Sequence, residues 1–199
     1  MVDYLDTSED FWAIVQQHTP IAIMSFSRGK NDRSWELEAA ARNRPQDDWV
    51  ISQQYIDNNG VTQTDTWNPP HPGGSAADFS PYNGQGTIAG NPPDPTKASD
   101  EKRNSNLPMT EIHDAIDAAF TDLQINPEID NSGNVGSFVS EYMAYHVVWY
   151  RDYINATHPD DPSKQCQRAG HTHVGVQVAV GNAETAVDIQ LDELFKVLS

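Results

Sequence analysis

Ser140 is a candidate catalytic residue, because it follows a glycine-containing turn and lies at the beginning of a strongly apolar predicted helix. Gly133 and Gly136 permit backbone angles that a side chain would disfavour, and Ser132 or Asn134 is the expected helix cap. The first turn of a helix has unpaired N–H groups and the positive end of the helix dipole. An enzyme would place a thiolate or an oxyanion site there. The alternative is that Ser140 is a small residue that packs near a helix start.

Two histidines, His171 and His173, alternate within a predicted strand at 169–178. Alternate residues of a strand share a face, so both imidazoles are expected on the same side. A metal site that used them would need His146 or His113 as a further ligand. Paired strand histidines are often structural, and no acidic ligand is adjacent. We therefore predict no metal and no cofactor.

Three basic residues, Arg28, Lys30 and Arg33, lie in a polar turn after the apolar run 21–26. The chain has only 12 Lys and Arg residues, so this is a local concentration of positive charge. At the carboxyl end of a strand, it predicts contact with an anion or a carbonyl group. A solvated loop is the alternative.

The elements that must position these residues alternate between helix and strand. Helices are predicted at 7–19, at 109–123, after the 132–136 turn and at 184–198, and strands at 21–26, 125–129 and 169–178. The unbroken apolar run 21–26 is typical of a strand buried on both faces of a parallel sheet. We predict an α/β fold in which residues 1–199 form a single three-layer domain, with a mostly parallel sheet and helices on both faces.

A proline- and glycine-rich insertion is predicted at about 58–106, including the clusters 68–74 and 91–95. The segment has little periodicity, so we interpret it as a long loop. Loops of this length are either poorly ordered or functional, and this one separates the region of Glu38 from the region of Ser140. It is therefore expected to border the same cleft as these two residues.

The segment around Ser140 resembles the nucleophile segment of the pyroglutamyl peptidase I (pyrrolidone-carboxylate peptidase) family. The family motif is roughly S-x-x-A-G-x-Y-x-C-N, followed four residues later by Tyr. The residues in register with it are Ser132, Gly136, Phe138 and Tyr145. The residues that differ are Val135 in place of Ala, Ser140 in place of the nucleophilic Cys, and Glu141 in place of Asn. The resemblance implies a phosphorylase/hydrolase-like α/β fold.

Two further segments carry the same resemblance. Segment 35–43 resembles E-R-V-A-I-N, which supplies the catalytic Glu, with Glu38 and Asn43 in register and Glu36 as the rival position. Segment 169–174 resembles A-G-F-I-H-V-P, which places His173 on the catalytic histidine. Without the resemblance, both glutamates would be interpreted as exposed residues of a helix surface.

The resemblance implies removal of an amino-terminal pyroglutamyl residue from peptides by a nucleophile, a histidine and a glutamate. Histidine would take the proton of the nucleophile, the carboxylate would orient the imidazole, and amides at the helix start would hold the oxyanion. The catalytic residues are then Ser140, His173 and Glu38, and the predicted substrate contacts are Phe138, Phe26 and Arg28.

The chain differs from the family pattern in three respects. A serine hydroxyl does not ionise as a thiol at a helix start does, so catalysis by Ser140 would depend on His173 as the base. The chain begins at what resembles the family's second strand, and the T-G-F-x-P-F motif, which helps to enclose the pyroglutamyl ring, has no counterpart. The 58–106 insertion has no clear equivalent. The alternative is a catalytically inactive peptidase-like scaffold that binds a peptide or protein partner.

Composition limits the classes of partner. The formal net charge of −17 would repel nucleic acid and anionic membranes. The single cysteine, Cys166, excludes an internal disulfide framework and fits a reducing compartment. No apolar run is long enough to span a membrane, and residues 1–10 lack the pattern of a signal peptide. We expect a cytoplasmic protein with a peptide substrate or ligand, and the resemblance implies homo-oligomers.

Overall fold

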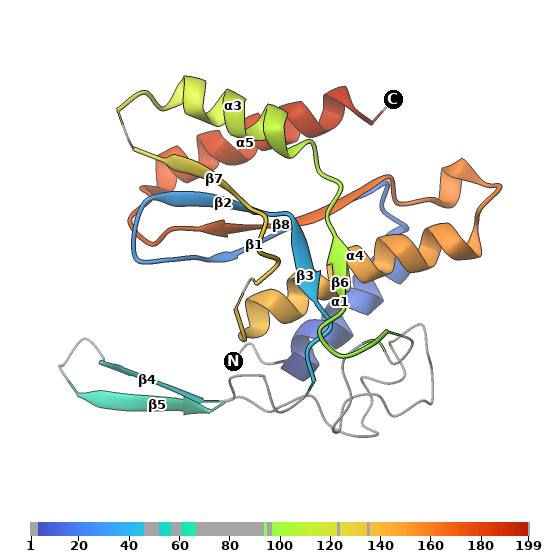
Figure 1. The fold of residues 1–199 in the computed structure, drawn as a ribbon, viewed down its shortest axis with the longest axis horizontal. Helices are drawn as coiled ribbons and strands as arrows, with labels where there is room; N and C mark the ends of the chain where they lie inside the picture. Colours follow the sequence, from blue (N-terminus) through green and yellow to red (C-terminus); the bar gives the residue numbers. More distant parts are fainter. Residues whose placement is uncertain are drawn as a thin grey trace.

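A four-stranded sheet forms the middle layer of the fold (Figure 1). The computed structural model describes residues 4–45, 52–56, 61–66, 94, 97–122, 124–134 and 136–198. The strand order is β1 (Ala22–Arg28), β8 (Arg168–Val174), β2 (Ser34–Glu38) and β7 (Asn126–Asp130). β1 and β8 are parallel, as are β2 and β7, whereas β2 and β8 are antiparallel. The sheet is therefore mixed, with mostly parallel pairing.

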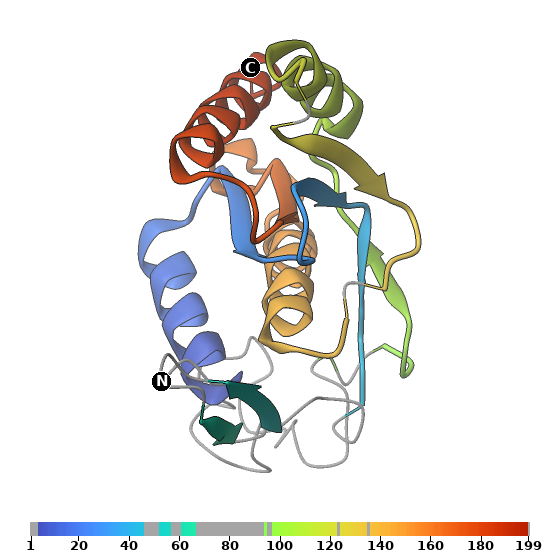
Figure 2. The ribbon, with the colours of Figure 1, turned by 90° about the vertical axis from the view of Figure 1, so that its left-hand side faces the viewer.

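Helices cover both faces of this sheet, which confirms the predicted α/β class (Figures 1 and 2). One face is covered by α1 (Tyr4–His18) and α4 (Val139–Thr157), and the other by α3 (Met109–Ala119) and α5 (Val180–Lys196). A short 3-10 helix, η2 (Pro162–Lys164), lies between α4 and β8. Within the described residues, no helix has both the length and the apolarity that membrane crossing requires.

Each face of the sheet has its own apolar core. Trp35 and Leu37 of β2 pack with Ile112 and Ile116 of α3 on one side. Trp12 of α1 packs with the α4 residues on the other, where the core also includes Tyr145, Val148 and Trp149. Full burial of a side chain of this size stabilises the fold by about 1.5–3 kcal/mol. These two cores hold the three layers together.

Strand β2 corrects the interpretation of segment 35–43 as a helix surface. All five residues of β2 are buried, including Glu36 and Glu38. Side chains alternate across a strand, so Trp35 and Leu37 enter the α3–α5 core while the two glutamates face the α4 side. The alternation of apolar and acidic residues is thus a strand pattern of period two, in an inner strand that lies between β7 and β8.

The observed ends of several helices and strands differ by a few residues from the predicted ends. α1 begins at Tyr4 instead of Thr7, α3 ends at Ala119 instead of 123, and α5 begins at Val180 instead of 184. The turn after Val174 ends β8, so the predicted strand 169–178 is shorter at its carboxyl end.

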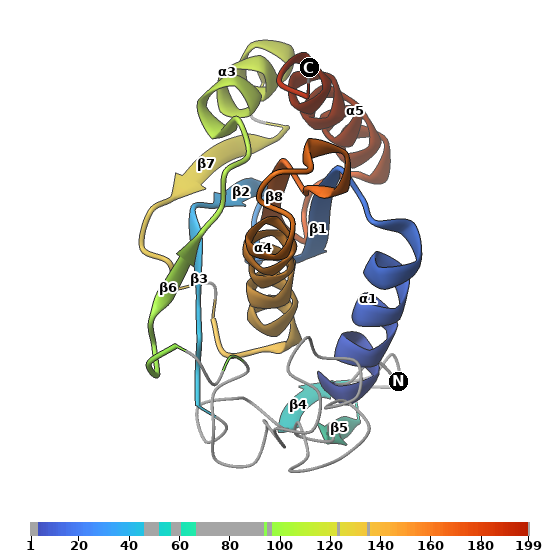
Figure 3. The same ribbon diagram turned by 90° about the vertical axis from the view of Figure 1, so that its right-hand side faces the viewer.

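The 58–106 segment is not entirely a loop. β5 (Thr62–Thr66) pairs with β4 (Ser52–Ile56), and β6 (Lys102–Asn104) pairs with β3 (Ala40–Arg42). Figure 3 shows β3 and β6 side by side next to α4. The proline-rich clusters 68–74 and 91–95 lie outside the described residues, except for Asp94, which is buried.

Candidate active site

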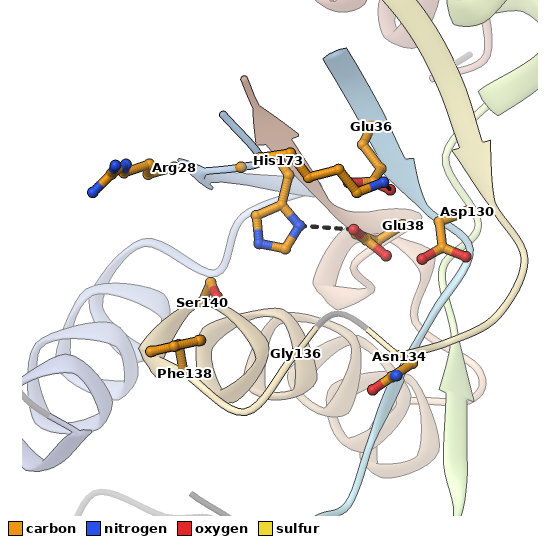
Figure 4. Close-up of a pocket in the computed structure, with 11 residues that line it drawn as sticks. Arg28, Glu36, Glu38, Asp130, Asn134, Gly136, Phe138, Ser140 and His173 are labelled. Carbon is orange, nitrogen blue, oxygen red and sulfur yellow. Dashed lines mark hydrogen bonds and ion pairs between the residues drawn. The ribbon is translucent and has the colours of Figure 1, made fainter. Parts of the chain in front are cut away.

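A pocket with a volume of about 330 Å³ lies between the sheet and the start of α4 (Figure 4). This volume is at the lower end of the range for small-ligand sites. The lining residues are Arg28, Gly29, Lys30, Glu36, Glu38, Asp130, Asn134, Gly136, Phe138, Ser140 and His173. The structure therefore brings together Ser140, His173 and Glu38, which are far apart in the sequence, together with Phe138 and Arg28.

His173 and Glu38 are joined by a short hydrogen bond. Nδ1 of His173 lies 2.7 Å from Oε1 of Glu38, and both side chains are buried. A carboxylate accepts, so Nδ1 carries the proton and donates, and Nε2 is left as an acceptor. Burial raises the pKa of Glu38, and the hydrogen bond from His173 opposes this shift. The pair has the arrangement of an oriented general base.

Ser140 is the second residue of α4 and is half-buried. In Figure 4 it lies on the helix side of the pocket, below the ring of His173. The helix N-cap is Phe138, which makes no side-chain capping bond, so the prediction of Ser132 or Asn134 as the cap is wrong. The N–H groups at the start of α4 thus receive no capping bond from the side chain of the N-cap residue, and at the pocket wall they favour negative charge.

The predicted glycine turn before α4 is confirmed. Gly133 and Gly136 both have positive φ angles, of 61° and 110°. Ser132 and Asn134 help to form this turn instead of capping the helix, since the Ser132 hydroxyl accepts a hydrogen bond from the Asn134 N–H at 3.0 Å. Arg42 ties the turn to β3, with Nε 2.8 Å from the Gly133 carbonyl oxygen. These contacts hold residues 132–134 against β3.

Glu141 anchors the beginning of α4. Its side chain is fully buried and accepts hydrogen bonds from the Arg42 backbone N–H at 2.9 Å and from Arg44 Nε at 3.1 Å. Burial raises the pKa of Glu141, while these two contacts lower it. Glu141 follows Ser140 in the helix, so these contacts with the last residue of β3 and with Arg44 after it hold the start of α4 in place.

Gly29 permits a close approach behind His173. A Cβ atom on Gly29 would lie 3.0 Å from Cβ of His173 and 3.2 Å from the backbone carbon of Val174. The Gly29 N–H also donates to the Val174 carbonyl oxygen at 2.7 Å. The turn after β1 is thus packed directly against the histidine.

The basic turn supplies two residues to the pocket, Arg28 and Lys30. Nζ of Lys30 lies 2.6 Å from Oε1 of Glu36, and this hydrogen bond raises the pKa of Lys30. Arg33 is not among the residues that line the pocket. The expected anion or carbonyl contact is therefore narrowed to Arg28 and Lys30.

Phe26 occupies the opposite face of the sheet from the pocket. Its ring packs against Trp35 with centroids 5.9 Å apart, and Trp35 belongs to the α3–α5 core. Strand alternation explains this position, because Ser25 and Ser27 face His171 on the other side. The structure does not support the predicted substrate contact for Phe26, whereas Phe138 lines the pocket and is 40% exposed.

His171 and His173 do share a face, with ring centroids 4.9 Å apart. His171 already has partners for both nitrogens, the hydroxyls of Ser25 at 2.7 Å and Ser27 at 2.9 Å. Burial lowers the pKa of His171 well below its usual range. The alternate serines Ser25 and Ser27, at the end of β1, were the signal for this contact, and the sequence interpretation missed it.

The metal site built on histidines is not assembled. His146 packs in the α1–α4 core, where its Nδ1 accepts a hydrogen bond from Nε1 of Trp12 at 3.0 Å. His113 lies on α3, on the other side of the sheet, with Nδ1 2.9 Å from Oδ1 of Asp114. Neither reaches His173.

Cys166 does not replace the missing cysteine nucleophile. It is free and completely buried in the α1–α4 core, away from the pocket lining. Burial raises the pKa of its thiol to about 12, so little thiolate exists at neutral pH.

Asn43, which is in register with a family residue, is a structural residue here. It is fully buried, its side-chain nitrogen donates to the Asp94 carbonyl oxygen at 2.8 Å, and its oxygen accepts from the Asp94 N–H at 2.9 Å. Asn43 thus holds the end of the insertion against β3.

Comparison with known proteins identifies the fold. No protein-family model and no curated protein matches the sequence. Pyrrolidone carboxyl peptidase from the hyperthermophile Pyrococcus furiosus matches with a TM-score of 0.59 at 16% identity, over 96% of this chain and 77% of that chain. A mutant of the same enzyme gives a TM-score of 0.61 with the same identity and coverage. Pyroglutamyl peptidase I from Bacillus amyloliquefaciens gives 0.53 at 15% identity, over 94% and 71%. This chain therefore has the fold of these peptidases.

Proposed function

We propose that this chain hydrolyses the amide bond that follows an amino-terminal pyroglutamyl residue of a peptide. Ser140 is the nucleophile, His173 the general base and Glu38 the residue that orients it. The observation that carries the proposal is the 2.7 Å bond between Nδ1 of His173 and Oε1 of Glu38, in the pocket that Ser140 also lines. The shared fold with pyroglutamyl peptidases supports the choice of substrate.

The proposed reaction begins when Oγ of Ser140 attacks the pyroglutamyl carbonyl carbon and its proton passes to Nε2 of His173. Glu38 stabilises the resulting imidazolium through Nδ1–H. The carbonyl oxygen becomes an oxyanion, which the N–H groups of the first turn of α4 stabilise. The C–N bond then breaks as His173 returns the proton to the leaving amine. Water hydrolyses the acyl ester by the same route and releases pyroglutamate.

The second candidate is a peptide-binding scaffold without turnover, and the identity of residue 140 favours it. A serine hydroxyl remains protonated at neutral pH. The positive end of the helix dipole therefore activates it as a nucleophile less than it activates a thiol, which can ionise there. The pocket would then hold the pyroglutamyl end of a ligand through Phe138 and Arg28, which line it.

Release of a fluorophore from a pyroglutamyl substrate tests the proposal. We would compare the unmodified chain with Ser140→Ala, Ser140→Cys and the double variant Ser140→Cys, His173→Ala. We expect turnover by the unmodified chain, no turnover by Ser140→Ala, and faster turnover by Ser140→Cys. Loss of the base should slow the Ser140→Cys variant by about 10²- to 10⁴-fold.

Two other outcomes are informative. Turnover by Ser140→Cys alone, with pyroglutamyl peptide binding by the unmodified chain, would favour the scaffold. Folded variants that show neither turnover nor binding would contradict both candidates.

A further inference from the structure

Three buried side chains converge in the pocket from two neighbouring strands. Glu36 and Glu38 are alternate residues of β2, and His173 of β8 pairs directly with Glu36 in the antiparallel register. Each residue offers one ligand atom, and these three atoms lie within 4.8 Å of one another. Two ligands with bonds of about 2.0–2.2 Å to one transition-metal ion lie at most about 4.4 Å apart, so a small movement of these side chains would bring all three onto a single ion.

The local charge balance favours a cation. The acidic residues that line the pocket are the buried Glu36 and Glu38 and the half-buried Asp130, and the basic ones are Arg28 and Lys30. A buried carboxylate requires a positive or hydrogen-bonding partner. Among the described residues, Glu36 forms an ion pair with Lys30, in which Nζ of Lys30 lies 2.6 Å from Oε1 of Glu36. The Lys30 side chain is 57% exposed, so solvation compensates readily for its displacement.

One atom in the cluster lacks a partner. Oε1 of Glu38 accepts the hydrogen bond from His173, whereas Oε2 is buried and has no hydrogen-bond partner among the described residues. Glu38 itself is only 2% exposed. A buried carboxylate oxygen without a partner is destabilising unless a donor or an ion satisfies it.

We propose that Glu36, Glu38 and His173 form a binding site for a divalent transition-metal ion such as Zn²⁺. Two carboxylates and one imidazole are a ligand set that zinc accepts, and three protein ligands leave a coordination position open toward the pocket. The ion binds Nδ1 of the neutral imidazole of His173, whose proton moves to Nε2, and Lys30 moves out to water.

This site does not rest on the proposed function, although it has a consequence for it. An ion on Nδ1 removes the hydrogen bond between His173 and Glu38 and leaves the proton of the imidazole on Nε2, which then cannot act as a base. Metal binding and the proposed catalysis are therefore mutually exclusive, and zinc inhibits any turnover that depends on this pair.

Isothermal titration of the full chain with zinc chloride, after removal of metals with a chelator, tests the site in the absence of substrate. We expect one site per chain and an affinity at least 10-fold lower for Glu36→Gln. Glu128→Gln is the matched control, because Glu128 lies 3.8 Å from the same Lys30 but outside the three ligands. Its zinc affinity should stay within about threefold of the unmodified chain. Circular dichroism checks that each variant is folded.

The results of the zinc titration distinguish the proposed site from zinc binding elsewhere on the chain. No zinc binding at millimolar concentration by the folded chain overturns the proposal. Equal binding by the unmodified chain, Glu36→Gln and His173→Ala also overturns it, and assigns zinc to surface histidines such as His113. Because the titration uses no substrate, a failure of the peptidase assay leaves this result unaffected.

Discussion

Oε1 of Glu38 lies 2.7 Å from Nδ1 of His173 across two antiparallel strands, where the two residues are diagonal neighbours. Glu38 pairs directly with His171, and the diagonal contact is within reach because both side chains are long. His171 is meanwhile held by two serine hydroxyls. The strand register thus brings both histidines near Glu38, and the serine contacts of His171 leave His173 to bond the carboxylate.

Glu38→Gln should lower kcat for the pyroglutamyl substrate by about 10²- to 10⁴-fold, with KM changed much less. The amide keeps the shape of the side chain but no longer stabilises the imidazolium form of His173. Steady-state kinetics checks the prediction, preferably in the Ser140→Cys background, where turnover is expected to be faster. Glu111→Gln on the surface of α3 is the control and should retain full activity. An active Glu38→Gln enzyme would contradict the assigned role.

Acid should destabilise the fold through His146. Burial lowers the pKa of His146 to about 3, with a smaller opposing effect from the charge of Asp94. Below pH 6.5 the unfolded chain binds a proton at this site that the folded chain does not bind. Stability is therefore lost as pH falls from 6.5 toward 3, by up to about 1.4 kcal/mol per pH unit.

Urea unfolding at pH 7 and pH 5 measures this effect. His146→Gln retains an acceptor for Trp12 and should lose less stability between the two pH values than the unmodified chain. His113→Gln, at the partly exposed His113, should lose as much as the unmodified chain. An equal loss in all three proteins would show that His146 does not cause it.

Arg103→Met should destabilise the fold by about 3–5 kcal/mol. The guanidinium lies 2.5 Å from Oδ2 of Asp94 and 2.6 Å from Oδ2 of Asp152, and Asp94 is fully buried. Removal of the arginine leaves a buried carboxylate without this counter-charge. Lys97→Met breaks an exposed ion pair with Glu101 and should cost less than about 1 kcal/mol. The urea midpoints compare the two, and similar midpoints would refute the difference.

Gly170→Ala and Gly181→Ala should change stability in opposite directions. A Cβ on Gly170 would meet Ser105 Oγ and lie 2.6 Å from Cδ1 of Leu107, so overpacking should cost about 1–3 kcal/mol. A Cβ on Gly181 has nothing within 4 Å among the described atoms, and Gly181 lies in α5. Alanine there should add about 0.5–1 kcal/mol of stability. Thermal melting distinguishes the two, and a rise in Tm for Gly170→Ala would contradict the packing argument.

The sequence alone determined the features that depend on neighbours along the chain. Positive φ angles at Gly133 and Gly136 were expected because glycine tolerates them, and the apolar helix after them was expected from its periodicity. The strand β1 followed from an unbroken apolar run, but the prediction that it is buried on both faces is wrong, because β1 is a half-buried strand at the edge of the sheet. Together these patterns were sufficient to predict helices on both faces of a mostly parallel sheet.

The tertiary structure decided the environment of the site. Glu36 and Glu38 are charged residues of a kind usually found at a surface, and they are buried because β2 is an inner strand of a sheet with helices on both faces (Figure 1). The contact between Glu38 and His173 spans 135 positions in the chain, and strand register sets it, as it also turns Phe26 away from the pocket. Local sequence encodes the period of a strand, but the face that becomes buried depends on which distant segments pack against it.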